Sequence, residues 1–286
     1  MHIICSKTPS LLVQNLAKIL NANLEQHITQ SFSNQEFFVR IVGDPRKILI
    51  EFPKYDSIND SIVNLVMILN SISCYDFKEL ILLIPYMPYS RQDIRNNIGE
   101  SLGLKAFADI LNNFNIDKII TFDLHSQISE KFFKSEIINI TPDIIFSEYL
   151  KCYKESQTIV LATDEGGRSR AKKVAEIINC EYIVPVKIRS NNSLEHYFLQ
   201  EINKPNIIIV DDIIDSGKTM SNLIKELEIK GVKSIDIYAT HILKPESIGD
   251  LAENELVKRI YSSTQLENLH TKITSCDICK TLLEYL

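Results

Sequence analysis

The residues whose types and spacing are best suited to ligand binding or catalysis lie between Asn206 and Met220, in the run Asn-Ile-Ile-Ile-Val-Asp-Asp-Ile-Ile-Asp-Ser-Gly-Lys-Thr-Met. The apolar residues Ile207–Val210 predict a buried β-strand that ends before the two acids. The pattern after Met220 predicts a helix. A polar turn between a strand and a helix suits anions, because backbone N–H groups and the positive end of the helix dipole point to the same place.

The side chains of this turn indicate which groups it would bind. Gly217 lets the backbone approach a ligand closely, and Ser216 and Thr219 offer hydroxyl donors. Asp211 and Asp212 suit the vicinal hydroxyls of a sugar or a hydrated magnesium ion. A phosphate and a diol held in one loop match a ribose 5-phosphate group.

Gly217-Lys218-Thr219 could also end a Walker A loop. That motif needs a glycine five positions before Gly217, where this chain has Asp212. We therefore reject the Walker A interpretation.

Two further clusters could hold magnesium. His125 lies just past a predicted strand, and Asp164 follows another strand and precedes a Gly-Gly pair. Together they could hold the ion around a polyphosphate, although magnesium prefers oxygen ligands such as the carboxylate of Asp164. A single histidine is more often a packing or surface residue than a ligand.

Two clusters carry cations after predicted strands. Arg91 could grip a phosphate in a fork and Gln92 could hydrogen-bond a purine edge. Lys187 and Arg189 are two residues apart at the end of a predicted strand, so they point to the same side. They could neutralise charge on a transferred phosphoryl group. Both clusters could instead be ordinary solvated surface.

Two loops could complete a nucleotide site. Phe32 could stack on an adenine while Glu36 binds its amine or ribose; otherwise Phe32 has a structural role. The segment Asp93–Gly103 has two asparagines and two glycines, which is typical of a mobile lid.

These clusters need a scaffold that brings strand ends together. The expected strands are residues 2–5, 24–29, 36–41, 47–52, 79–85, 118–122, 137–140, 158–162, 182–186, 207–210, 234–240, 259–262 and 270–274. The expected helices are residues 9–20, 59–72, 102–111, 142–151, 168–178, one after Met220 and 276–286, with 187–192 a polar segment.

The alternation predicts an α/β fold with two domains, each a mostly parallel sheet flanked by helices. The break near Thr141-Pro142 gives an N-terminal domain of residues 1–141 and a C-terminal domain of residues 142–286. In open α/β sheets, ligands bind beyond the carboxyl ends of the strands. The polar clusters fall there, so we expect them to form one composite site.

Composition narrows the function classes. The 286 residues carry a net charge of −6 and no long basic run, which gives nucleic-acid binding little support. No apolar run approaches the roughly 18 residues of a membrane span. Scattered cysteines and no secretory leader ahead of Cys5 indicate the reducing cytoplasm. Cys276 and Cys279 lack a second pair or a histidine at zinc spacing, so we expect no metal or redox role.

The motifs together resemble the ribose-phosphate diphosphokinase (PRPP synthetase) family. They are Phe32-Ser-Asn-Gln-Glu36, Pro85-Tyr-Met-Pro-Tyr-Ser-Arg-Gln-Asp93, Gly99-Glu100 with Lys105, Thr121–His125, Thr163-Asp-Glu-Gly-Gly167, Lys187-Ile-Arg189, the PRPP loop 210–219 and Ala239-Thr-His241. The match covers roughly residues 30–241 in the family's order, and it is poor in the C-terminal tail.

The resemblance implies two phosphoribosyltransferase-like domains and a transferase of nucleotide biosynthesis that makes PRPP and AMP from ATP and ribose 5-phosphate. It implies a dimer-based homo-oligomer. By position, it assigns Phe32, Asn34, Glu36, Arg91, Gln92 and Asp93 to ATP, His125 and Asp164 to Mg²⁺, and Lys187 and Arg189 to transition-state stabilisation. It assigns Asp211 and Asp212 to the ribose hydroxyls, and Asp215, Ser216, Gly217, Lys218 and Thr219 to the 5-phosphate.

Three departures from the family pattern leave two alternatives open. Asn34 replaces an acid, Ile94 replaces a cation, and Lys218 replaces a small residue. A Gly-Lys-Thr ending also occurs in phosphoribosyltransferases that consume PRPP, although such an enzyme would not need the N-terminal nucleotide motifs. The other alternative is a non-catalytic regulatory homologue.

Overall fold

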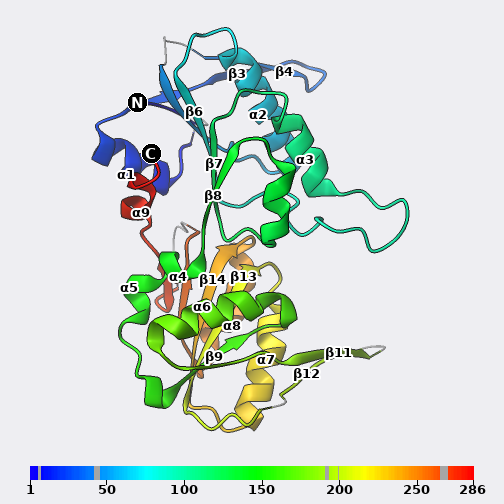
Figure 1. The fold of residues 1–286 in the computed structure, drawn as a ribbon, viewed down its shortest axis with the longest axis vertical. Coiled ribbons are helices and arrows are strands. Elements are labelled where there is room, and N and C mark those ends of the chain that lie inside the picture. Colours follow the sequence, from blue (N-terminus) through cyan, green and yellow to red (C-terminus); the bar gives the residue numbers. More distant parts are fainter. Residues whose placement is uncertain (6–7, 42–45, 191–192, 199, 265–269) are drawn as a thin grey trace. The chain divides into compact units, whose positions relative to one another are not determined.

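The computed structural model describes residues 1–286 apart from 6–7, 42–45, 191–192, 199 and 265–269. The chain forms two compact units. The first comprises Met1–Ile140 together with Leu282–Leu286, and the second comprises Thr141–Thr281. Each unit is an α/β structure with its own sheet (Figure 1).

The first unit is built on a six-stranded, wholly parallel sheet in the order β2-β1-β5-β6-β7-β8. Its strands are β1 (His2–Cys5), β2 (Asn23–Gln26), β5 (Lys47–Glu51), β6 (Glu79–Ile84), β7 (Lys118–Phe122) and β8 (Glu136–Ile140). A separate antiparallel hairpin, β3 (Ile28–Ser31) and β4 (Phe37–Arg40), lies between β2 and β5 in the chain.

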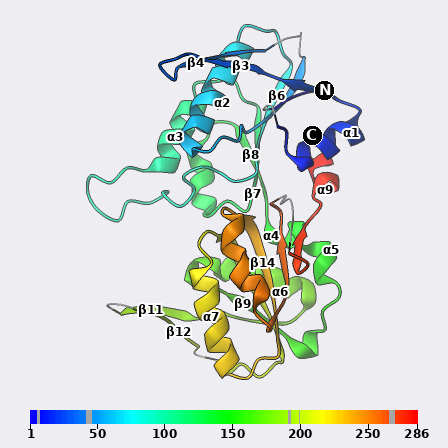
Figure 2. The same ribbon diagram turned by 180° about the vertical axis from the view of Figure 1, so that it is seen from behind.

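Helices cover both faces of this sheet. They are α1 (Leu11–Leu20), α2 (Ile58–Ile72) and α3 (Gly103–Leu111), with a 3₁₀ segment η1 (Gln127–Phe132). Figures 1 and 2 show α2 and α3 on one face and α1 on the other. Serine caps begin two of these helices, since Ser10 accepts the Val13 N–H at 3.2 Å and Ser57 accepts the Asn59 N–H at 3.2 Å.

Alternate strand residues fill the core beneath α2 and α3. Ile48 and Ile50 of β5 and Leu82 of β6 are fully buried against Leu65 and Ile68 of α2. Burying each such side chain contributes about 1.5–3 kcal/mol. This apolar layer holds the strands rigid and leaves the polar residues at their carboxyl ends.

The second unit repeats the arrangement with a parallel sheet in the order β10-β9-β13-β14-β15-β16. Its strands are β9 (Thr158–Ala162), β10 (Glu181–Ile183), β13 (Asn206–Ile214), β14 (Ser234–Ile242), β15 (Val257–Ser262) and β16 (Ile273–Ser275). An antiparallel pair, β11 (Val186–Ser190) and β12 (Ser193–Tyr197), follows β10 and extends from this unit (Figures 1 and 2).

The second sheet is also covered on both faces. Its helices are α4 (Pro142–Ile145), α5 (Ser147–Leu150), α6 (Arg168–Ile178), α7 (Lys218–Ile229) and α8 (Gly249–Glu253), with 3₁₀ segments η2 (Glu155–Gln157), η3 (Glu165–Gly167) and η4 (Pro245–Ile248). Helix α6 lies on the face opposite α7 and α8 (Figures 1 and 2). The short helix α9 (Cys279–Leu283) contains the point where the chain leaves the second unit for the first.

The two units therefore share one strand order. In each, the first strand of the unit pairs with the second on one side and with the third parallel strand on the other. In each, an antiparallel hairpin is inserted before that third strand. This order places the switch point between β1 and β5 in the first unit and between β9 and β13 in the second, and ligands of open α/β sheets bind at such points.

Several predicted elements differ from the structure. The predicted strand 24–29 is two strands that meet at His27, and the polar segment 187–192 contains most of strand β11. The predicted strand 207–210 continues to Ile214, so both acids of the opening run lie within β13 rather than after it. The helix predicted over 142–151 is two short helices, and the C-terminal helix has only the residues of α9.

No helix in the described part of the chain has the length and apolar character needed to cross a membrane.

The thiols of Cys276 and Cys279 are buried, and burial raises the pKa of each to about 12. Thiols held in this neutral form are poor nucleophiles and poor metal ligands.

Candidate active site

The switch point of the second unit gathers the acids that the sequence singled out. Strand β9 ends at Ala162 and leads to Asp164, while β13 carries Asp211 and Asp212 near its carboxyl end. The two strands are hydrogen-bonded neighbours, with Val210 opposite Ala162. The parallel register brings both polar segments to the same edge of the sheet.

Asp211 and Asp212 have different surroundings. The Asp212 side chain is buried, and its Oδ2 lies 3.3 Å from a terminal nitrogen of Arg170. The Asp212 N–H donates to Oδ1 of Asp211 at 2.9 Å. Burial and the adjacent Asp212 carboxylate raise the pKa of Asp211 well above its usual value, against the opposing influence of Arg170.

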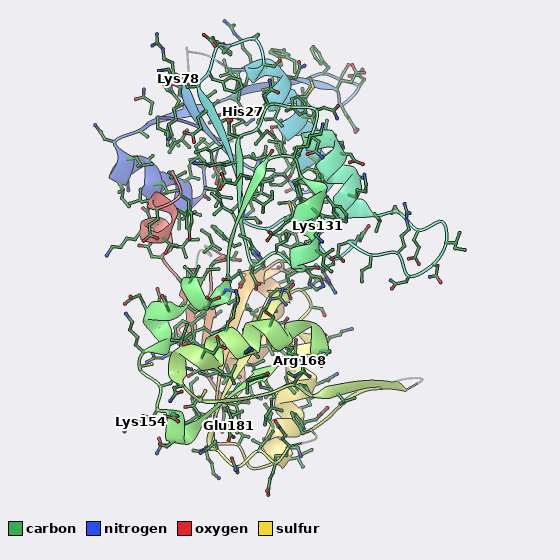
Figure 3. All side chains as sticks on the ribbon, viewed as in Figure 1. His27, Lys78, Lys131, Lys154, Arg168 and Glu181 are labelled. Carbon is green, nitrogen blue, oxygen red and sulfur yellow. The ribbon has the colours of Figure 1, made fainter. Side chains whose placement is uncertain are left out.

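The loop after β9 is compact because it contains two glycines. A Cβ on Gly166 would lie 3.2 Å from Oδ1 of Asp164, and one on Gly167 would lie 3.2 Å from the Cβ of Ala162. The Gly167 N–H donates to the Asp164 carbonyl at 3.1 Å. Asp164 is thus held close to the end of β9, and α6 begins at Arg168, which Figure 3 labels.

The segment after β13 turns directly into α7. Gly217 caps the helix with φ of 70°, a conformation that glycine adopts without a steric penalty. Lys218 begins the helix, and an α-helix leaves its first backbone N–H groups without intrahelical acceptors. Asp215, at the start of the turn, forms an exposed ion pair with Lys244 at 3.1 Å. The turn has the form of an anion site at a helix N-terminus.

The remaining residues of this turn differ in exposure. Ser216 and Lys218 are exposed, Thr219 is half-buried, and Gly217 is buried. The exposed hydroxyl and ammonium groups are accessible to a ligand.

Lys187 and Arg189 lie on β11, two residues apart, paired with His196 and Leu194 of β12. Their side chains lie outside the described part of the structure. What the structure adds is that they stand on a hairpin and not in a loop.

In the first unit, Phe32 stands at the end of the β3–β4 hairpin. Its ring is half exposed and lies 6.1 Å from that of Phe38. The turn is closed by the Phe32 N–H, which donates to the Glu36 carbonyl at 2.7 Å. Asn34 Oδ1 accepts the Glu36 N–H at 3.1 Å. Asn34 therefore has a structural role in this turn, and both it and Glu36 are exposed.

Arg91, Gln92 and Asp93 follow β6 in a tight turn. Tyr89 has φ of 59°, and the Gln92 N–H donates to its carbonyl at 2.8 Å. Arg91 and Gln92 are exposed, whereas Asp93 Oδ2 accepts the Ser129 hydroxyl at 3.0 Å. The turn thus presents a guanidinium and an amide outwards while the carboxylate anchors it.

His125 is exposed and follows a strained turn at the end of β7. The buried Asp123 has φ of 45°, and its N–H donates to the Ile140 carbonyl at 2.9 Å. The Leu124 N–H donates to Asn139 Oδ1 at 2.9 Å. A non-glycine residue in the left-handed region is uncommon, and such strain is found preferentially at functional sites.

The segment Asp93–Gly103 is an exposed loop that extends from the first unit in both views (Figures 1 and 2). Glu100 organises its end, accepting the Asn96 N–H at 2.8 Å and the Asn97 N–H at 3.1 Å. Ile98 is fully exposed. The structure shows an internally hydrogen-bonded loop; the predicted lid motion stays a prediction.

The donor set of the second unit suits a hydrated magnesium ion. Asp164 contributes to raising the pKa of Asp211, so these two carboxylates interact electrostatically. Among the described residues, no three His, Cys, Asp or Glu side chains are grouped so that they could hold a metal by themselves. Magnesium needs only one or two carboxylates when water and substrate phosphates fill its other positions.

Sequence reasoning missed Arg170, which lies on the first turns of α6. Its side chain is only 8% exposed and it pairs with Asp212. The run Arg168-Ser-Arg170 carries no motif that separates a buried arginine from an exposed one. Only helical periodicity could have indicated it, because Arg170 shares a face with the buried Val174.

Two protein-family models match the chain. A model of the N-terminal domain of ribose phosphate pyrophosphokinase matches residues 1–114, and a phosphoribosyl transferase domain model matches residues 134–262.

Individual proteins match over most of their length. The ribose-phosphate pyrophosphokinase of Thermococcus kodakarensis is 31% identical over 79% of this chain and 79% of its own. That of Methanobrevibacter smithii is 25% identical over 95% of this chain and 93% of its own. The crystal structure of phosphoribosylpyrophosphate synthetase from Mycobacterium smegmatis has a TM-score of 0.87, covering 100% of this chain and 96% of its own. At 22% identity, this last likeness shows the fold.

Proposed function

Since the chain belongs to the ribose-phosphate pyrophosphokinase family of enzymes, we propose that it transfers the β,γ-diphosphoryl group of ATP to the C1 hydroxyl of ribose 5-phosphate. The hydroxyl oxygen attacks the β-phosphorus, and the bond from that phosphorus to the α–β bridging oxygen breaks. AMP leaves with the bridging oxygen, the hydroxyl proton passes to solvent, and PRPP forms.

The observation that carries the proposal is the order of groups at the switch point of the second unit. Asp211 and Asp212 stand near the end of β13, and Gly217 caps α7 a few residues later. A diol and a phosphate could be bound there together, as ribose 5-phosphate requires. The N-terminal family model over residues 1–114 supports ATP as the second substrate.

In this proposal the second unit binds the sugar phosphate. Asp211 and Asp212 accept hydrogen bonds from the ribose hydroxyls. The turn Asp215–Thr219 (Asp215, Ser216, Gly217, Lys218 and Thr219) and the start of α7 bind the 5-phosphate. Lys187 and Arg189 neutralise the charge that develops during transfer. Stabilisation of this charge is a main source of catalysis in phosphoryl transfer.

The first unit would bind ATP through its two exposed turns. Phe32 stacks on the adenine, Asn34 and Glu36 bind its polar edge or the ribose, Arg91 and Gln92 contact phosphate and base, and Asp93 supports their turn. His125 in this unit and Asp164 in the second unit would each serve as a Mg²⁺ ligand, and Mg²⁺ neutralises phosphate charge when it is bound. We extend the proposal to a dimer-based homo-oligomer that works in the cytoplasm.

The deciding experiment incubates the purified protein with ATP, magnesium and ribose 5-phosphate, and omits each in turn. We expect AMP and PRPP in equal amounts, and neither when any component is missing. ADP in place of AMP would mean transfer of a single phosphoryl group and would exclude the proposed reaction. PRPP consumption that depends on an added base would identify a phosphoribosyltransferase, and ATP binding without any product would identify a regulatory homologue.

A further inference from the structure

Arg170 is a buried cation beside the candidate sugar site, and no residue role proposed above uses it. It lies on α6, and its side chain is 8% exposed. One terminal nitrogen lies 3.3 Å from Asp212 Oδ2, and the other donates to the Gly166 carbonyl at 3.4 Å. One guanidinium therefore contacts both segments that form the switch point.

The contacts continue from Arg170 to a second carboxylate. The Asp212 side chain is 9% exposed. The backbone N–H of Asp212 donates to Oδ1 of Asp211 at 2.9 Å. A contact that holds Asp212 in place thus also holds the backbone N–H group that orients the Asp211 carboxylate.

The other contact of Arg170 reaches the loop that carries Asp164. Gly167 lets this loop pack closely against β9, because a Cβ there would lie 3.2 Å from the Cβ of Ala162, and a Cβ on Gly166 would lie 3.2 Å from Oδ1 of Asp164 within the loop. A glycine loop has little stiffness of its own, because glycine has the largest backbone freedom of any residue. A guanidinium bound to the Gly166 carbonyl restrains it from the side of α6.

Because the ion pair between Arg170 and Asp212 is buried, it contributes little net free energy to folding. Removing two charges from water costs about as much as their attraction returns, and apolar residues of similar volume often replace buried ion pairs without loss. Arginine is the residue best suited to hold two acceptors at fixed angles, because its donors form a planar, rigid fork.

We propose that Arg170 is a positioning residue for the sugar site: it fixes Asp212 and, through the Asp212 N–H, Asp211, and it ties both to the loop of Asp164. Arg170 itself does not touch the substrate. The inference rests on the proposed function, since it gives Asp211 and Asp212 the role of binding ribose hydroxyls. It differs from a purely structural role in predicting an effect confined to one substrate.

The test compares four variants with the wild type: Arg170→Gln, Arg170→Lys, Asp212→Asn and the double variant Arg170→Gln/Asp212→Asn. Lys172→Gln is the matched control, because Lys172 is an exposed cation on the same helix, 3.9 Å from Glu176. Michaelis constants for ribose 5-phosphate and for ATP are measured on each protein. Calorimetry measures ribose 5-phosphate binding without turnover, and thermal unfolding confirms that each variant is folded.

We expect Arg170→Gln to raise the Michaelis and dissociation constants for ribose 5-phosphate by about tenfold to a hundredfold, as loss of a supporting partner typically does. The Michaelis constant for ATP should change by less than about twofold, as should every constant of Lys172→Gln. Arg170→Lys should recover part of the loss because it keeps the charge. The double variant should be no worse than Asp212→Asn, since Arg170 acts through Asp212.

A folded Arg170→Gln protein with an unchanged constant for the sugar overturns the inference. So do equal losses for both substrates, or losses that add in the double variant. If Arg170→Gln fails to fold, the constants for the two substrates are compared in Arg170→Lys, which keeps the positive charge. A wild type that binds and converts ribose 5-phosphate while Arg170 variants behave like Lys172→Gln refutes this inference alone. A wild type that neither binds nor converts the sugar overturns the proposed function and the inference with it.

Discussion

Asp211 and Asp212 are neighbours in the chain, yet they meet different surroundings because side chains alternate along a strand. Asp212 is buried against Arg170, and Asp211 is half-buried with a pKa raised by burial and by Asp212. A carboxyl group that is costly to ionise alone gains from a ligand that brings hydroxyl donors or a cation. The sequence identified both acids but could not show this difference, because it follows from the α6 side chain that packs against one of them.

Lys187 is the residue on which the proposed chemistry depends most directly. We expect Lys187→Ala to lower turnover by about a hundredfold to a thousandfold, the typical loss when a group that stabilises developing charge is removed. Binding of ribose 5-phosphate should change little, since the interaction belongs to the transition state. Steady-state kinetics and calorimetry measure the two quantities.

Lys154→Ala is the control, because Lys154 is an exposed lysine of the same unit, labelled in Figure 3. Its kinetic constants should match those of the wild type. Equal losses of binding and turnover in Lys187→Ala would count against a transition-state role for this residue.

Because His27 is buried, we expect the free energy of unfolding to depend on pH. His27 is buried between β2 and β3 in the first unit (Figure 3), and its Nδ1 lies 2.8 Å from the Cys5 carbonyl, which can only accept. Burial lowers the pKa of His27, although the hydrogen bond to Cys5 opposes this. Below about pH 6.5 the unfolded chain takes up a proton that the folded chain does not, so the free energy of unfolding falls as the pH falls.

Denaturant unfolding at about pH 7.5 and pH 5.5 measures this loss. His27→Gln should show a smaller fall, and the exposed His270→Gln should show the fall of the wild type. An identical fall in His27→Gln and wild type would assign the pH dependence to other groups.

At the scale of elements, α3 begins where it can affect the candidate nucleotide turn. A Cβ on Gly103 would lie 2.6 Å from Gln92 Oε1 and 3.1 Å from the Tyr89 ring and Cβ. Gly103→Ala should therefore displace the flexible amide of Gln92 while the helix persists. We expect the Michaelis constant for ATP to rise about fivefold, the effect of losing one hydrogen bond, and that for ribose 5-phosphate to stay unchanged.

Gly249→Ala provides the matched control, because Gly249 also begins a helix and a Cβ there would meet nothing within 4 Å. It should leave both Michaelis constants unchanged. If Gly103→Ala binds ATP as the wild type does, Gln92 has no part in nucleotide binding.

The elements also show how far sequence patterns reach. The strands at β1, β7 and β9 were predicted to the residue, since each is a short apolar run between polar residues. Strand β13 was ended too early because Asp211 and Asp212 are unusual in a strand; pairing with β14 as far as Ile242 overrides that local preference. The hairpin of β11 and β12 was missed because its polar residues, such as Ser190 and Ser193, also suit a loop.

At the scale of the whole molecule, residues Leu282–Leu286 belong to the first unit although they follow the entire second unit. Leu282 is fully buried, and the backbone oxygen of Leu286 accepts from the Lys47 ammonium at 2.6 Å. The domain predicted over residues 142–286 instead included this tail, because periodicity predicts a helix but an apolar face does not identify the unit against which it packs.

Leu282→Ala should therefore destabilise the first unit by about 2–5 kcal/mol, the usual cost of a cavity in a core. Hydrogen exchange should accelerate in β1 and β5 while β9 and β13 keep their protection. Leu283→Ala is the control, since this neighbour is only half-buried and should cost less. Faster exchange in β9 and β13 alone would assign Leu282 to the second unit.

The placement of Leu282–Leu286 has a consequence for how the chain folds on the ribosome. Domains usually fold in the order in which they are synthesised, at about 5–20 residues per second. Here the first unit begins that process first but lacks its buried residue Leu282 until all of Thr141–Thr281 has been translated. For roughly 7 to 28 s the first unit therefore exists without Leu282, long enough for a chaperone to bind it.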